Sequence, residues 1–259
     1  MVLLNWLYEH KNSLKLKMSL ASWPERARLD LYDLEMSIQY NEKIFFGRGV
    51  DKVENIAIKK AASEIVERLL SRELNISTTG IAIKVDSESF FDSDLHAKNE
   101  TLERYFLKLH LDNNIHFLNV VPETELISKF KKHHPSIEIR FFKLNNSVDC
   151  FSYGCLIQEE AVVSTGFSAE QDSVKALEKS FIEALPNFYF LKENSIDDSE
   201  KPWHLKASFI NQVTSLVGAQ GENIYLPEPI LKKIDLNLKE HPLLKTAPIS
   251  ASKYEVVLG

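Results

Sequence analysis

Two short segments of the chain share the charge pattern Glu-x-x-Glu-Arg, at residues 64–68 and 100–104. On a helix, positions i, i+3 and i+4 lie on one face, so each block presents two carboxylates and a guanidinium together. The carboxylates are those of Glu64, Glu67, Glu100 and Glu103, and the guanidiniums are those of Arg68 and Arg104. If the two helices face each other, four carboxylates converge and repel, which raises their pKa values unless a divalent cation such as Mg²⁺ binds. The arginines could then hold phosphate oxygens through charge-assisted hydrogen bonds.

Each block taken alone is also typical of a solvated helix surface. A Glu–Arg pair spaced i,i+4 supports an isolated helix by only about 0.3 kcal/mol and needs no ligand. The repetition favours a shared site, because both blocks sit late in a long helix that follows a glycine-containing strand end. The pattern alone leaves both an ion-paired surface and a metal site open.

Hydrophobic periodicity predicts the elements that position these blocks. Alternation over residues 34–40, a turn at residues 41–43 and a second apolar run indicate a hairpin ending at Gly47-Arg48-Gly49. Long helices are expected over residues 52–73 and 90–111, with a strand over residues 80–85 between them. After these elements we expect a helix that begins at Pro122, followed by strands over residues 137–144, 148–158 and 161–166. A helix over residues 171–185 should end at Pro186. The remaining expected elements are a helix over residues 203–217 and a strand over residues 252–258.

The expected organisation is one domain with a helical extension. Residues 1–33 form the helical N-terminal extension, residues 34–190 the core, and residues 191–259 a helix and strand that complete the same domain. Within the core, a strand, a glycine and an acidic helix follow one another three times.

Composition narrows the class of protein. The net charge of −6, from 31 basic and 37 acidic residues, gives no reason to expect a nucleic-acid surface. Cys150 and Cys155 are too few for a disulfide framework and are expected to be reduced. No apolar run reaches the ~20 residues of a membrane span, and the N-terminus lacks a signal pattern, so a cytoplasmic protein is expected. No Walker-type loop is present, so ATP binding cannot rest on a P-loop.

The acidic blocks belong to three larger groups of residues along the chain. The first group is Gly47-Arg48-Gly49, alanines 57 and 61, and the block at 64–68; the second is Thr79-Gly80-Ile81-Ala82, Asp92 and the block at 100–104; the third is residues 164–169, residues 176–179 and Glu183. These three groups, in this order and over residues 34–190, resemble the YcaO-like family. The resemblance implies an α+β fold in which antiparallel strands pack against long helices that carry the acidic blocks.

The resemblance also implies an activity and a set of site residues. Members of that family use ATP and Mg²⁺ to activate a peptide backbone amide, which gives an azoline or a thioamide. By position, the Mg²⁺ site would be formed by Glu64, Glu67, Glu100, Glu103 and Glu183, and the cofactor-binding residues would be Arg48, Arg68, Asp92 and Arg104. The resemblance assigns no catalytic residue in this chain.

The chain departs from the family pattern at several points. The interval between Glu67 and Gly80 is shorter than usual, Pro186 stands where the family often has Gln, and no leader-binding module is visible. We therefore expect a precursor peptide as substrate, a leader-binding or E1-like partner protein that presents it, and assembly as a homo- or hetero-oligomer. The alternatives are a non-catalytic scaffold subunit of a peptide-modifying complex and an accessory factor in sulfur transfer to a protein.

Overall fold

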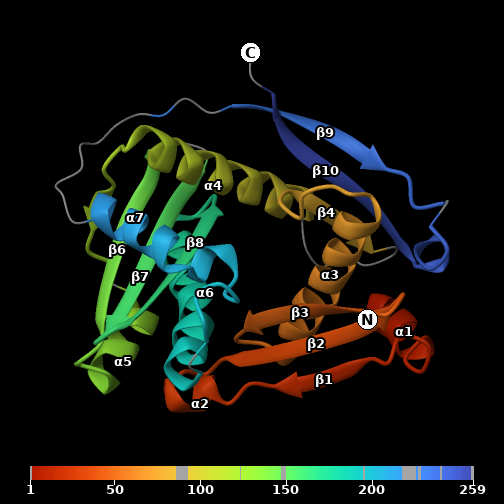
Figure 1. The fold of residues 1–259 in the computed structure, drawn as a ribbon, viewed down its shortest axis with the longest axis horizontal. Coiled ribbons are helices and arrows are strands. Elements are labelled where there is room, and N and C mark those ends of the chain that lie inside the picture. The colour runs from red at the N-terminus through yellow and green to blue at the C-terminus, as the bar shows by residue number, and fades with distance from the viewer. Residues whose placement is uncertain are drawn as a thin grey trace. The chain divides into compact units, whose positions relative to one another are not determined.

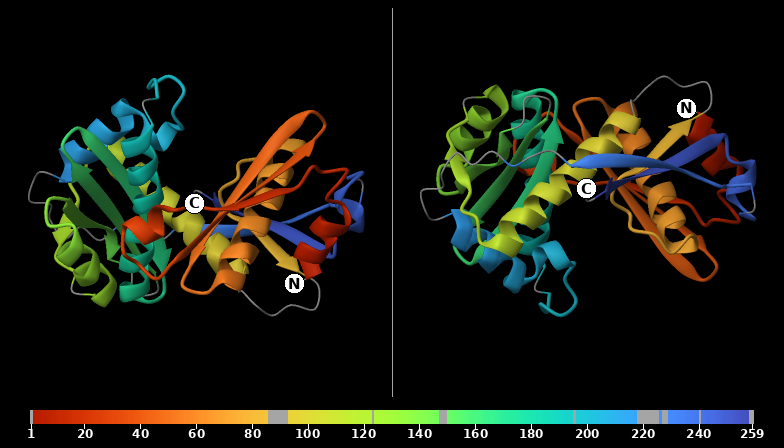
Figure 2. Two further views of the ribbon diagram at one scale, coloured as in Figure 1. Left: turned by 90° about the horizontal axis from the view of Figure 1, so that it is seen from below. Right: turned by 90° about the horizontal axis from the view of Figure 1, so that it is seen from above.

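The structure, a computed structural model, describes residues 2–85, 93–122, 124–146, 150–194, 196–217, 226, 229–239 and 241–257. It divides into two compact units (Figure 1 and Figure 2). The first unit comprises residues 1–98 and 230–259, and the second comprises residues 99–229. Helix α4 (Ser93–Asn113) begins in the first unit and ends in the second. No helix in the described ranges has the length and apolar character that crossing a membrane requires.

The first unit contains an antiparallel sheet with strand order β1-β2-β3. Its strands are β1 (Lys17–Leu20), β2 (Tyr32–Tyr40) and β3 (Lys43–Asp51), and helix α3 (Glu54–Glu73) packs on β2 and β3. Asn41 and Glu42 join β2 to β3 with φ values of 47° and 63°, as a tight two-residue hairpin requires. The predicted hairpin is confirmed, although β3 continues through Gly47-Arg48-Gly49 to Asp51.

Two glycines of β3 allow α3 to approach the sheet closely. A Cβ on Gly47 would lie 2.9 Å from the Ile65 nitrogen, and one on Gly49 would lie 2.8 Å from the Ala61 nitrogen. The helix is lined with alanine at this contact, where Ala57 and Ala61 are fully buried. Small residues on both sides therefore fix the register in which α3 carries its acidic block.

A second antiparallel sheet of the first unit has strand order β4-β10-β9. It pairs β4 (Ile81–Val85), β10 (Ile249–Val257) and β9 (Ile230–Leu236), so the C-terminal hairpin completes a sheet begun near residue 81. Asp94 ties this sheet to the start of α4 through Lys84, Lys233 at 2.9 Å and the Tyr254 hydroxyl at 2.8 Å. Burial alone raises the pKa of Asp94, but these hydrogen bonds outweigh it and hold the pKa well below its usual value.

The second unit is built on a four-stranded antiparallel sheet with order β5-β6-β7-β8. The strands are β5 (Leu118–Val120), β6 (Glu138–Asn146), β7 (Phe151–Glu159) and β8 (Val162–Glu170). Helix α6 (Ser173–Glu193) covers one face along β7 and β8, as Figure 2 shows, and α5 (Glu125–His133) packs beside it. Helix α7 (Ala207–Val217) packs on the opposite face, where Phe209 meets Phe167 at 6.0 Å between ring centroids.

The N-terminal segment is less helical than the sequence predicts. Only α1 (Val2–Glu9) and α2 (Trp23–Arg26) are helices within residues 2–30, whereas Lys17–Leu20 is the edge strand β1. Strand β1 pairs with Leu34–Ser37 of β2, so backbone pairing overrides the helical spacing of the leucines.

The prediction that the third acidic helix ends at Pro186 is wrong. Helix α6 continues to Glu193 with Pro186 inside it. An interior proline lacks one N–H and crowds the carbonyl of residue i−4, which is Ile182. The helix persists because Leu185, Phe188 and Tyr189 are buried on either side of the proline, and their packing outweighs the lost hydrogen bond.

Candidate functional site

The second and third acidic blocks supply one group of interacting charges within the second unit, which we call the acid cluster. Its members are Glu100, Glu103 and Arg104 of α4, Glu170 at the end of β8, and Lys179 and Glu183 of α6. Lys179 donates a hydrogen bond to Glu170 at 2.8 Å, and Arg104 pairs with Glu103 at 3.3 Å. The resemblance assigned a site role to four of these six residues, and it assigned none to Glu170 or Lys179.

Local packing places these side chains. Lys179 and Glu183 are four residues apart on α6 and therefore share a helix face. At this point the helix lies directly against β8, because a Cβ on Gly166 would overlap the Ser180 carbonyl and lie 2.5 Å from the Ala184 nitrogen. Gly166 thus has the same role for α6 that Gly47 and Gly49 have for α3.

Glu103 is the most deeply buried acid of the cluster. Only 5% of the residue is exposed, and burial raises the pKa of its carboxyl while the charges of Arg104 and Lys179 oppose the rise. Its Oε1 atom accepts no hydrogen bond from the part of the chain that the structure describes. A buried oxygen that accepts no hydrogen bond lowers the stability of the folded protein. A bound cation or hydrogen-bond donor at Glu103 would offset that loss.

Glu183 is the exposed acid of the cluster, on the surface of α6. Loss of hydration raises the pKa of Glu183 to about 8. Lys179 opposes this rise, whereas the negative charges of Glu103 and Glu100 add to it. Its carboxylate therefore ionises readily only where additional positive charge is supplied.

Two cations are built into the cluster. Burial lowers the pKa of Lys179, but Glu183 and Glu170 outweigh it, and the resulting pKa is raised. Burial likewise opposes the charge of Arg104, whose pKa is nevertheless raised by Glu103, Glu100 and Glu183. With all four carboxylates ionised, the two cations leave an excess of two negative charges, which matches one divalent cation.

The donor set fits Mg²⁺ in the form in which proteins usually hold it. Mg²⁺ is commonly bound by one or two carboxylates together with phosphate oxygens and water. The cluster offers carboxylate oxygens for the ion and two cations for phosphate oxygens. Within the described ranges, no three His, Cys, Asp or Glu side chains form a ready-made metal site by themselves.

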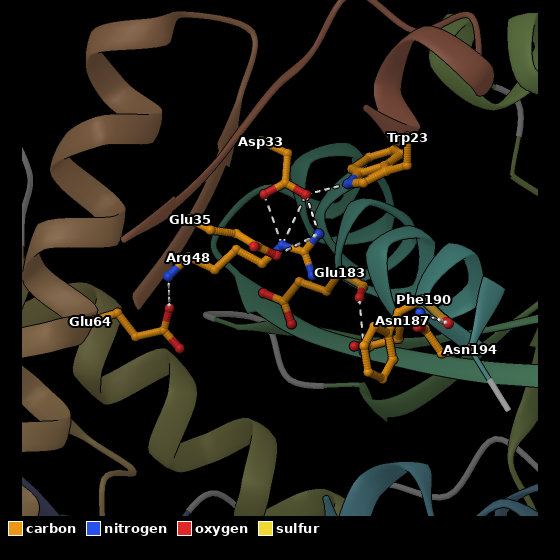
Figure 3. Close-up of polar contacts among 9 residues, drawn as sticks. All are labelled: Trp23, Asp33, Glu35, Arg48, Glu64, Glu183, Asn187, Phe190 and Asn194. Carbon is orange, nitrogen blue, oxygen red and sulfur yellow. Dashed lines mark hydrogen bonds and ion pairs between the residues drawn. The ribbon is translucent and has the colours of Figure 1, made fainter. Parts of the chain in front are cut away.

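The first acidic block lies in the first unit and has its own partners. Glu64 Oε2 accepts a hydrogen bond from the backbone N–H of Arg48 at 2.6 Å (Figure 3). Its Oε1 accepts a hydrogen bond from Arg68. Strand β3 is an edge strand of its sheet, so Glu64 satisfies a donor that strand pairing leaves open. Glu67 is half-buried on the same helix.

Arg48 is held by an aspartate that the sequence did not single out. Its Nε donates to both oxygens of Asp33, at 2.8 and 2.9 Å, and its Nη2 donates to Oδ2, which also accepts from the Trp23 indole (Figure 3). Asp33 is 1% exposed, and Glu35 lies 3.8 Å from the same guanidinium. The sequence feature that could have indicated this pair is an acidic residue in a largely apolar strand. In the hairpin register, Asp33 lies diagonally across from Arg48 on the neighbouring strand.

The structure therefore brings some of the predicted site residues together within each unit. Glu100, Glu103, Arg104 and Glu183 meet in the second unit, and Glu64 meets Arg48 and Arg68 in the first. Asp92 lies outside the described residues. The convergence of all the acidic blocks on one metal ion remains a prediction.

Other proteins match this chain in structure and not in sequence. No family model and no curated protein sequence matches it. A YcaO from Methanopyrus kandleri, solved with bound AMPPCP and Mg²⁺, superposes on this chain with a TM-score of 0.68 at 12% sequence identity. The match covers 98% of this chain and 89% of the YcaO chain. The fold is YcaO-like. A heterocyclase in complex with substrate and cofactor also matches, with a TM-score of 0.65 at 9% identity, over 99% of this chain.

The YcaO-like fold bears out the fold class predicted from the sequence, with antiparallel sheets packed on long helices. The two Glu-x-x-Glu-Arg blocks lie on the long helices α3 and α4 of this fold. The match spans 52% of the heterocyclase chain.

Proposed function

We propose that the acid cluster binds Mg-ATP and that the protein uses it to modify a peptide by activating a backbone amide. The observation that carries this proposal is the buried Oε1 atom of Glu103, which accepts no hydrogen bond from the described residues and lies beside Arg104. The YcaO-like fold supports it, because a protein with that fold was solved with AMPPCP and Mg²⁺.

The chemistry requires an activated oxygen. A peptide amide oxygen is a poor leaving group, whereas a phosphate is a good one. A Cys, Ser or Thr side chain of the peptide, or an external sulfide, adds to the amide carbonyl, and the adduct oxygen takes the terminal phosphoryl group of ATP with release of ADP. Loss of phosphate and a proton then gives an azoline or a thioamide.

The residues of this chain would contribute mainly positioning and charge neutralisation. Glu103 would supply a carboxylate ligand to Mg²⁺, with Glu100 and Glu183 adding negative charge around it, and the bound ion would neutralise charge on the phosphate oxygens. Arg104 and Lys179 would donate to phosphate oxygens, and Glu170 would hold Lys179 in place through its 2.8 Å hydrogen bond. Burial strengthens each of these interactions relative to water.

A partner protein would present the substrate. The precursor peptide would be recruited by a leader-binding or E1-like protein, in an assembly with one or more copies of this chain. Within this proposal, azoline and thioamide formation remain alternatives, since both use the same activation of the amide oxygen.

A second candidate function is a non-catalytic scaffold, and one observation favours it. Lys179 already pairs with Glu170 and is coupled by charge to Glu183 and Glu103. An internal cation of this kind can stabilise an acidic group with no metal bound. In that case the cluster would be structural, and substitution of Lys179 would destabilise the protein whether or not Mg-ATP were present.

Turnover separates the two functions. ATP hydrolysis is measured with the partner protein and with a short precursor peptide rich in Cys, Ser or Thr encoded beside the gene. We expect peptide-dependent hydrolysis and, by mass spectrometry, either loss of water or replacement of oxygen by sulfur. Glu103→Gln should abolish both, whereas Glu125→Gln, on the exposed start of α5, should retain them. Unchanged turnover in Glu103→Gln would exclude the proposed site.

A further inference from the structure

One of the three tryptophans is exposed, and it lies beside the acid cluster. Trp6 and Trp23 are 5% and 2% exposed, whereas Trp203 is 53% exposed. Trp6 and Trp23 are therefore part of the core, and Trp203 is not. A half-exposed indole leaves a large apolar surface in water, where it is suited to contact another molecule.

The Trp203 ring is held in place by its neighbours in the second unit. Phe209 meets it edge-on, with ring centroids 5.0 Å apart at 80°, and Phe209 in turn packs on Phe167 of β8. The guanidinium carbon of Arg104 lies 5.5 Å from the Trp203 ring centroid, within cation–π range. The Trp203 indole is therefore held in position by its contacts with Phe209 and Arg104, and Phe209 packs on the sheet.

Arg104 connects this surface to the acid cluster. The same guanidinium that contacts Trp203 pairs with Glu103 at 3.3 Å and interacts with Glu100 and Glu183. Lys201 and Lys206 flank the 3₁₀ helix Trp203–Leu205 in sequence, and Lys201 pairs with Asp198 at 3.4 Å. The surroundings of Trp203 therefore combine an aromatic face with the guanidinium of Arg104 and the acid cluster.

We propose that Trp203 stacks on the adenine base of the bound nucleotide, with Arg104 at the junction between base and phosphates. The proposal rests on Mg-ATP as the ligand of the acid cluster. A nucleotide has a flat aromatic base at one end and a polyanion at the other, and it satisfies both Trp203 and Arg104. A peptide side chain would cover the indole but carries no polyphosphate that could reach Arg104.

Binding of two probes tests the assignment. Dissociation constants for Mg-ATP and for Mg-tripolyphosphate, which has no base, are measured for wild type, Trp203→Ala and Trp203→Phe. We expect Trp203→Ala to raise the dissociation constant for Mg-ATP by about 5- to 150-fold, which is the range expected when one base–aromatic stack is lost. Trp203→Phe should keep most of the affinity, and Mg-tripolyphosphate should bind all three proteins equally. Phe190→Ala, which removes another exposed aromatic of the second unit, should change neither constant.

Fluorescence gives a second readout that needs no folded alanine variant. Because Trp6 and Trp23 are buried, quenching by a ligand at the surface reports mainly on Trp203. Mg-ATP should change the tryptophan emission of wild type, Mg-tripolyphosphate should not, and Trp203→Phe should lose the change.

The outcomes that overturn the inference are distinct. If Trp203→Ala binds Mg-ATP as wild type does and only the KM for the peptide rises, the indole contacts the peptide. If both probes are weakened equally, Trp203 acts on Arg104 and not on the base. If wild type binds neither probe, the proposed function itself fails, and the base site fails with it.

Discussion

Asp33 accepts hydrogen bonds from both Nε and Nη2 of Arg48, so a fully buried carboxylate fixes a guanidinium on the strand that carries Gly47 and Gly49. Asp33→Asn would leave Arg48 without its charged partner. We expect a loss of about 2 kcal/mol of unfolding free energy in urea, below the range for fully buried pairs because Arg48 is 29% exposed.

Glu35→Gln provides the matched control for Asp33. It lies on the same strand, 3.8 Å from the same guanidinium, but its side chain is 50% exposed. Its effect should stay within about 0.5 kcal/mol. Equal effects of the two substitutions would show that Asp33 adds nothing beyond surface charge, and a double-mutant cycle with Arg48→Met would measure the pair directly.

Gly166 determines how closely α6 approaches β8, so Gly166→Ala should disturb both stability and the site. The added Cβ would overlap the Ser180 carbonyl, and relieving that contact must shift the helix segment that carries Glu183. We expect a destabilisation of about 1–3 kcal/mol together with weaker Mg-ATP binding. Ser168→Ala, on the same face of β8, is the control and should have a small effect. Wild-type stability in Gly166→Ala would contradict the close packing described for this contact.

The raised pKa of Glu183 predicts a pH-dependent stability in the absence of Mg²⁺. Its pKa is about 8 in the folded protein against 4.5 as the ordinary value, so between these values the folded state binds more protons than the unfolded state. Raising the pH through this window therefore lowers the stability of wild type. Glu183→Gln cannot ionise and should gain stability relative to wild type from pH 4.5 to pH 8. A constant difference between the two proteins across this window would refute the shift, and Glu125→Gln should follow wild type throughout.

Pro186 should be dispensable for α6. An interior proline costs about 3 kcal/mol of helix stability, and alanine would restore an N–H for the Ile182 carbonyl. Loss of two buried ring methylenes offsets roughly half of that gain, at about 0.8 kcal/mol each. We expect Pro186→Ala to raise the unfolding free energy by about 1 kcal/mol. A loss of stability would mean that the packing of the proline ring outweighs the hydrogen bond.

The parts of the fold that could be predicted from the sequence have strong local signals. Residues 34–40 of β2 alternate, β3 begins with an apolar run at residues 44–46, and α3 shows an apolar face from Ala57 to Leu69. Strand β9 was not predicted because Lys232, Lys233 and Asp235 interrupt its apolar residues, and because it joins the sheet only by pairing with β10. Pro186 misled the prediction because tertiary burial overrides a local helix-breaking signal.

The sequence predicts that the candidate site is a group of charged residues on a helix, but it does not identify all of the residues in that group. The spacing of Glu100, Glu103 and Arg104 marks a charged helix face, but Lys179 and Glu170 join it only through the packing of α6 on β8. Trp203 reaches Arg104 across about 100 residues of sequence, so only the folded unit reveals the contact. Likewise, the Asp33–Arg48 pair depends on the register of the hairpin.

Calorimetric titration of the protein with ATP, with and without Mg²⁺, is the most direct measurement of the central claim. We predict saturable binding of one nucleotide that requires Mg²⁺ and is lost in Glu103→Gln but kept in Glu125→Gln. Absence of Mg-ATP binding by wild type, or undiminished binding by Glu103→Gln, would contradict the assignment of the acid cluster as a nucleotide site.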